Sequence, residues 1–153
     1  MGETPKQQLD QFIARFTPEI AKIAAASVRT LRQRYPTATV LVYDNYNALA
    51  IGFAPAERTS DAIFSIACYA KRVNLCFLLA GKTKLKDPHG LLEGEGKLNR
   101  FVPLEGAHTL DEPAVRDLMD QAAAGAPVPF PDSGKGPLVI KSISAKQRPR
   151  RPA

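Results

Sequence analysis

The feature that most constrains the fold is a series of four extended segments with short connections. Residues 39–43 (TVLVY) combine β-branched and aromatic side chains, which favour a pleated strand. Residues 48–53 alternate large and small side chains, and residues 63–69 and 73–79 are again apolar and extended. Because strands that follow one another through short turns pair antiparallel, this pattern predicts an antiparallel meander.

The alternation within residues 48–53 separates the side chains by size. Leu49, Ile51 and Phe53 fall on one face of the expected strand, and two alanines and a glycine fall on the other. A face of small residues would let a helix approach closely, or it would leave room for a ligand. We favour the packing interpretation, in which a helix lies against the small face.

Helical start signals flank the extended segments. Thr4 with Gln7 three residues later fits a capping box, which predicts a helix over residues 5–16. Thr17 repeats this signal before a helix predicted over residues 18–34, where apolar residues recur at helical spacing. A third start signal predicts a helix over residues 112–124.

These elements together predict the fold class. We expect an α+β domain over residues 1–126, with a twisted antiparallel sheet of about five strands packed by helices. The sheet spans residues 39–104, and its fifth strand is residues 98–104. Residues 127–153 follow as a Pro/Gly-rich linker, a trailing strand over residues 138–144 and a basic tail.

The positive charge of the chain is concentrated at its C-terminus. The net charge is +6, with 21 basic and 15 acidic residues, but every acidic residue lies at or before Asp132. Five basic residues follow residue 140, so the first 140 residues hold 16 basic and 15 acidic side chains. This is the pattern of a basic arm and not of a basic face, so we expect no nucleic-acid partner.

The composition bears on the cellular location of the protein and on the structure of the tail. No apolar run reaches the ~18 residues that a membrane span requires, and the first residues lack an apolar signal region, so we expect a cytoplasmic protein without a membrane partner. Residues 145–153 carry too little apolar surface to fold alone, so we predict a solvated tail. The alternative is an arm that grips a second subunit or an acidic partner.

The densest group of unusual residues is residues 91–104 (LLEGEGKLNRFVPL). A structural interpretation has Asp87 capping a short helical turn over residues 89–93, which Gly94 ends in a left-handed conformation. A functional interpretation places charged side chains around one opening, where glycines allow a ligand close to the backbone. The candidate ligand-binding residues are Glu93, Glu95, Lys97 and Arg100, with Tyr43, Asp44 and Tyr46 as neighbours.

Lys97 and Arg100 would bind a small anionic ligand, because a guanidinium offers a planar fork to carboxylate or phosphate. A nucleotide-hydrolysing phosphate loop does not fit, since Gly90 and Gly96 are separated by five residues and Leu98 stands where a hydroxyl is required. We predict no catalytic residues, because no serine lies in a nucleophile elbow.

Two cysteines and two histidines add weaker signals. Cys68 and Cys76 would face each other if the hairpin between them were centred on Arg72, although free thiols are favoured in a cytosolic chain. His89 and Glu93, with Glu95 nearby, could share a divalent cation, but so few mixed ligands predict no defined metal site.

Two motifs resemble a known family. They are Val42-Tyr43-Asp44 with Tyr46-Asn47-Ala48, and Leu91-Leu92-Glu93-Gly94 with Gly96-Lys97, Arg100 and Leu104. From about residue 20 to residue 124 the chain resembles the YdhG-like family of bacterial domains of unknown function. The resemblance implies a frataxin-like sheet packed by helices, and one member of the family is described as a frataxin-like intracellular iron chaperone.

The sequence departs from what iron binding would require. Glu3, Asp10 and Glu19 alternate with basic residues along the first helices, so they form no ridge of carboxylates, the hard oxygen ligands of frataxin-type sites. We therefore expect a non-enzymatic module that binds a small ligand or a partner. The alternatives are an iron or metal chaperone, and a homo-oligomer, such as a homodimer, in which residues 138–151 cross between subunits.

Overall fold

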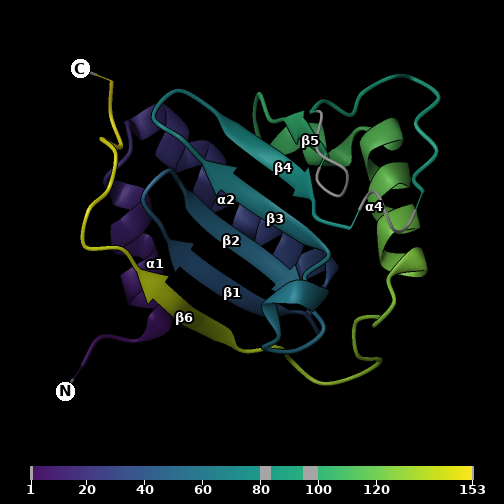
Figure 1. Cartoon of the computed structure of the whole chain (residues 1–153), viewed down its shortest axis with the longest axis horizontal. Helices are drawn as coiled ribbons and strands as arrows, with labels where there is room; N and C mark the ends of the chain where they lie inside the picture. The colour runs from purple at the N-terminus through teal and green to yellow at the C-terminus, as the bar shows by residue number, and fades with distance from the viewer. Residues whose placement is uncertain (1, 80–83, 95–99, 153) are drawn as a thin grey trace.

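The computed structural model shows an α+β fold built on one six-stranded mixed sheet, and it describes residues 2–79, 84–94 and 100–152 (Figure 1). The strand order is β5-β4-β3-β2-β1-β6. The strands are β1 (Thr39–Asp44), β2 (Leu49–Ala54), β3 (Phe64–Cys68), β4 (Val73–Phe77), β5 (Arg100–Pro103) and β6 (Leu138–Ile143). The helices are α1 (Pro5–Ala14), α2 (Pro18–Arg34) and α4 (Pro113–Gly125), with short 3₁₀ turns η1 (Thr59–Asp61) and η2 (Ala107–Asp111).

The helix starts follow the local signals in the sequence. The Thr4 hydroxyl accepts a hydrogen bond from the Gln7 N–H at 3.1 Å, and the Gln7 side chain accepts one from the Thr4 N–H at 2.9 Å. This reciprocal pair is the capping box that the sequence predicts. Helix α1 ends at Ala14, earlier than expected, because the N–H of Phe16 bonds back three residues to Ile13 in a tighter turn.

The meander of four antiparallel strands is confirmed, but the sheet is not wholly antiparallel. Strand β6 pairs with β1 in parallel, with Val40 opposite Leu138 and Val42 opposite Ile140. Parallel strands cannot be joined by a tight turn, and here the chain from β2 to α4 lies between β1 and β6. Strand β5 begins at Arg100, so the first two residues of the predicted fifth strand lie outside the described residues.

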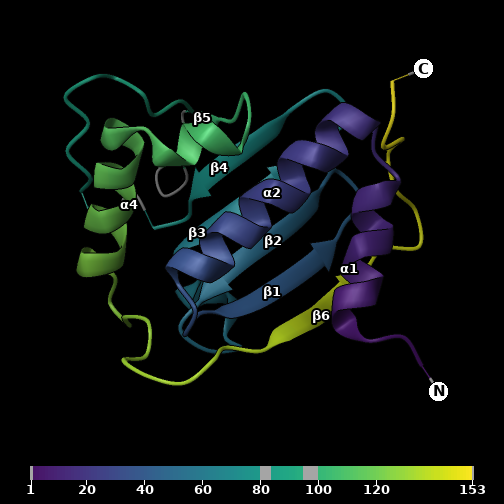
Figure 2. The same ribbon diagram turned by 180° about the vertical axis from the view of Figure 1, so that it is seen from behind.

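Helices α1 and α2 cover one face of the sheet, and neither lies over the other face (Figures 1 and 2). The large side chains of β2, such as Ile51 and Phe53, point into the core with Val28 and Leu31 of α2. The prediction that a helix packs on the small face of β2 was therefore wrong. The physical reason is that the larger side chains gain more from burial, so they take the helix-covered side.

The register of the β3–β4 hairpin separates the two cysteines. Cys68 lies opposite Val73 and Cys76 lies opposite Ser65, so the turn is centred between Ala70 and Lys71 and not on Arg72. The condition under which the thiols would face each other is therefore not met, and the register also puts them on opposite faces of the sheet. Both cysteines are free, and burial raises the pKa of Cys68 to about 12 and that of Cys76 to about 11.

Residues 145, 146, 148, 149, 151 and 152 of the basic tail are exposed, as the composition predicts, but the tail is fastened to the fold at one residue. Arg150 is only 5% exposed, and its guanidinium donates to a carboxylate oxygen of Asp44 at 2.9 Å. The C-terminal residues therefore pack on their own chain at the end of β1. Homodimer formation through residues 138–151 stays a prediction. None of the helices in the described part of the chain is long and apolar enough to cross a bilayer.

Candidate ligand-binding groove

The sheet order separates the ligand-binding residues that the sequence groups together. Arg100 begins β5 at one edge, whereas Tyr43 and Asp44 lie on β1, four strands away. Adjacent strands are ~4.8 Å apart, so roughly 19 Å separates β5 from β1. Tyr43, Asp44 and Tyr46 therefore do not share one opening with Arg100.

Residues 87–94 form a turn beside β5. The two carboxylate oxygens of Asp87 accept from the N–H groups of Leu91 at 2.9 Å and Leu92 at 2.8 Å. These bonds stabilise a turn, so the predicted helical turn over residues 89–93 was wrong. Gly94 does adopt a left-handed conformation, with φ of +105°.

Glu93 pairs through its backbone with Phe101, at 2.8 Å and 3.0 Å, and its side chain is exposed. Arg100 is half-buried. Glu95 and Lys97 lie outside the described residues. A ligand-binding role for this stretch stays a prediction.

The residues on β1 and the turn after it already have protein partners. The Tyr43 hydroxyl forms a hydrogen bond with the Thr59 hydroxyl, and the Asp44 carboxylate is buried against Arg150. Tyr46 is 49% exposed, and the guanidinium of Arg148 lies 5.6 Å from the centre of its ring. These contacts within the chain account for the polarity of this region.

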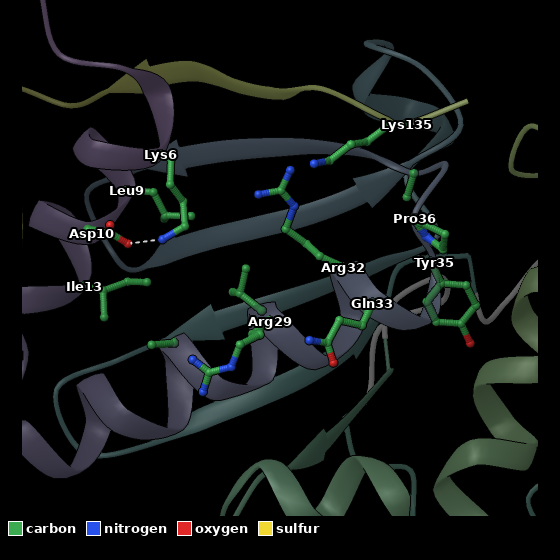
Figure 3. Close-up of a pocket in the computed structure, with 13 residues that line it drawn as sticks. Lys6, Leu9, Asp10, Ile13, Arg29, Arg32, Gln33, Tyr35, Pro36 and Lys135 are labelled. Atoms are coloured by element: carbon green, nitrogen blue, oxygen red, sulfur yellow. Dashed lines mark hydrogen bonds and ion pairs between the residues drawn. The ribbon is translucent and has the colours of Figure 1, made fainter. Parts of the chain in front are cut away.

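A groove of about 480 Å³ lies between α1 and α2, and it ends near the start of β1 (Figure 3). Its apolar lining comes from both helices and from the residue that precedes β1. These apolar residues are Leu9, Ile13, Ala25, Val28 and Ala38. We call this feature the α1/α2 groove.

Four basic side chains and one carboxylate surround the groove. Lys6 is neutralised by Asp10, which lies 2.5 Å away on the same face of α1. Arg29 and Arg32 stand three residues apart on α2, and Lys135 comes from the segment before β6. Figure 3 shows the side chains of Arg32 and Lys135 extending towards each other at one end of the groove.

Three of these cations have no compensating group among the described residues. Within residues 2–79, 84–94 and 100–152, no ion pair or hydrogen bond involves the side chains of Arg29, Arg32 or Lys135. Like charges that approach each other raise the local positive potential. The groove therefore presents an apolar surface beside an electropositive end.

The backbone of the linker fixes the position of Lys135. The N–H of Gly136 donates to the Pro36 carbonyl at 2.9 Å, and the N–H of Val40 donates to the Pro137 carbonyl at 2.8 Å. A Cβ at Gly136 would stand 1.8 Å from the Ala38 carbonyl oxygen, so only glycine fits this approach. Earlier in the same linker, the centre of the Phe130 ring lies 5.3 Å from the centre of the Tyr35 ring.

Sequence reasoning missed the groove because its residues come from three distant segments. Apolar residues at helical spacing do not by themselves distinguish a core face from a groove wall, and Lys135 lies in a linker. One signal was available: between Glu19 and Asp44 there are four basic residues and no acidic one. Such an imbalance on a single helix indicates an anion-facing surface.

No group of three or more His, Cys, Asp or Glu side chains that could hold a metal ion occurs in the part of the chain that the structure describes. The iron prediction therefore gains no ligand set from these residues. It stays an untested alternative.

Comparison with known proteins gives no identification. No protein-family model, no curated protein and no solved structure matches the chain. Membership of the YdhG-like family stays a prediction that rests on the two motifs given above.

Proposed function

We propose that this protein is a non-enzymatic binding module that takes a small amphipathic anion in the α1/α2 groove. The observation that supports the proposal is an apolar lining beside Arg29, Arg32 and Lys135, for which the described part of the chain supplies no ion-pair partner. A YdhG-like, frataxin-like architecture remains part of the proposal. It is supported by the motifs in residues 42–48 and 91–104.

The size of the groove fits a small molecule. Its volume of about 480 Å³ lies within the range of roughly 300–1,000 Å³ that is usual for ligand pockets. Each buried methylene contributes about 0.8 kcal/mol, so an eight-carbon chain would supply several kcal/mol of binding. Exposed charges contribute about 1 kcal/mol or less each. The apolar body therefore provides most of the affinity, and the charges determine which head group binds.

The head group should be a carboxylate or a phosphate. Arg32 offers a planar donor fork to either anion, and Lys135 offers a mobile point charge on the other side of it. A cationic amphiphile of the same length would be repelled by the same side chains. The predicted small anionic ligand is thus retained, and we place it at Arg32 and Lys135, while its binding by Lys97 and Arg100 stays a separate prediction.

Titration calorimetry with octyl phosphate, octanoate and octylammonium tests the proposal. We expect the wild-type protein to bind both anions with sub-millimolar affinity and not to bind octylammonium. The double substitution Arg32→Gln with Lys135→Gln should weaken anion binding about tenfold, since it removes two contributions of about 1 kcal/mol or less.

The matched control is Lys22→Gln, which removes one charge from the same helix at an exposed position outside the groove lining. It should change the affinity less than twofold. Absence of anion binding to the wild-type protein, or equal binding by the double variant, would overturn the proposed function.

A further inference from the structure

Of the two helices that line the groove, α1 has fewer side chains buried in the core than α2. Helix α1 buries two residues, Leu9 and Ile13, whereas α2 buries five. Burying one such side chain stabilises by roughly 1.5–3 kcal/mol. Helix α1 lies against α2 and β6 (Figure 2), and both of its buried side chains line the groove. The position of α1 therefore depends on contacts beyond its own core residues.

The C-terminal residues hold the far end of α1. The guanidinium of Arg151 donates to the carbonyls of Arg15 at 3.0 Å and Ala14 at 3.5 Å. The Arg15 side chain donates to Gln147 at 2.6 Å. The last carbonyls of a helix lack partners within the helix and carry partial negative charge, so a cation there is favourable. We call Gln147, Arg150 and Arg151 the C-terminal clamp.

Arg150 is the buried anchor of the clamp. Its side chain is 3% exposed and that of Asp44 is 2% exposed, and they pair at 2.9 Å. The same guanidinium donates to the Asn45 carbonyl at 2.6 Å, and its central carbon lies 5.7 Å from the centre of the Phe16 ring. The other Asp44 oxygen lies 3.6 Å from Arg15. One carboxylate therefore joins β1, the end of α1 and the C-terminal segment.

We propose that the C-terminal clamp regulates the α1/α2 groove by holding α1 in the position that binds ligand. This inference rests on the proposed function of the groove. Arg15 stands two residues beyond Ile13, so displacement of the clamp moves a residue that lines the groove. Release of the clamp leaves α1 to be ordered by the ligand at the time of binding, which lowers affinity. By linkage, ligand binding stabilises the clamp to the same extent.

Hydrogen exchange without ligand tests the hold of the clamp on α1. In Arg150→Gln we expect the amides of Leu9 and Ile13 to exchange about tenfold faster, while those in the middle of β2 remain as in the wild type. The matched control is Arg148→Gln, which removes from the same segment an arginine whose guanidinium lies over the Tyr46 ring. A folded Arg150→Gln variant with wild-type exchange in α1 would overturn the inference.

Arg15→Gln provides a second variant if Arg150→Gln does not fold. Its side chain is half exposed, and the substitution removes the contacts with Gln147 and Asp44 while leaving the buried pair intact. We expect about threefold faster exchange at Ile13. Unchanged exchange in this variant would also contradict the clamp.

Octyl phosphate then tests the regulation. We expect Arg150→Gln to bind it about fivefold more weakly than the wild type, and the ligand to slow exchange of the Arg148 amide, which bonds to the Tyr46 carbonyl. If the wild-type protein does not bind octyl phosphate, the proposed function is wrong. The hydrogen-exchange experiment without ligand still tests whether the clamp holds α1. If both proteins bind equally, regulation fails and the groove stands.

Discussion

Two groups of arginines in this chain meet opposite environments. Arg150 and Arg15 surround the buried carboxylate of Asp44, and their charges are compensated within the fold. Arg29 and Arg32 border the α1/α2 groove, where the part of the chain that the structure describes offers them no acidic partner. Arginine therefore stabilises the fold through a buried ion pair at one place, and at the other its charge is available to a ligand. Burial and the local carboxylate decide which.

The largest effect should come from Asp44→Ala. Removing one partner of a buried ion pair leaves Arg150 with an uncompensated charge, so we expect a loss of about 3–5 kcal/mol in the free energy of unfolding. Urea unfolding measures this. The control is Asp111→Ala, whose carboxylate pairs with Arg34 at 2.7 Å but is 64% exposed, and which should cost less than about 1 kcal/mol. Equal losses in the two variants would contradict the distinction between buried and exposed pairs.

Gly136→Ala should have the next largest effect, and it should act on the groove. Its Cβ would clash with the Ala38 carbonyl, so the backbone must shift at a cost of about 1–3 kcal/mol and displace Lys135. The affinity for octyl phosphate should fall about threefold, roughly the effect of losing one exposed charge beside the groove. In Gly134→Ala an added Cβ meets no atom within 4 Å, and only the left-handed backbone, with φ of +91°, is strained. A drop in affinity in Gly134→Ala equal to that in Gly136→Ala would show that backbone strain, and not the clash, is responsible.

Salt should separate the two arginine groups. Exposed charges are screened over about 10 Å at 0.1 M salt, whereas buried pairs are screened much less. We expect octyl phosphate to bind about threefold more weakly when sodium chloride is raised from about 0.05 to 0.5 M. The destabilisation by Asp44→Ala should stay within about 0.5 kcal/mol over the same range. If the affinity did not change with salt, the charged side chains would not contribute to ligand binding in the groove.

The smallest effect should come from Arg29→Gln. This side chain is exposed at the border of the groove and lies apart from the converging Arg32 and Lys135 (Figure 3). We expect a loss of affinity of about twofold and a change in unfolding free energy within about 0.5 kcal/mol. A tenfold loss of affinity in calorimetry would move the head-group site to Arg29.

Local interactions made much of the fold predictable from the sequence. Thr4 and Thr17 cap their helices through residues three positions away, and the helix stripes follow from spacing alone. The four strands of the meander are joined by short turns, so their order and direction follow from the chain itself. Where the local signal left the register open, as in the turn at Ala70 and Lys71, only the structure decided it.

The sequence by itself therefore determined the α+β class, the helix starts and the meander, because those depend on contacts between residues close in the chain. The tertiary structure alone decided that β6 joins β1, that Arg150 finds Asp44 and that Lys135 faces Arg32. These contacts join residues about 100 positions apart, and no periodicity relates such positions. They form only when folding has brought the sheet edge, the linker and the helices together.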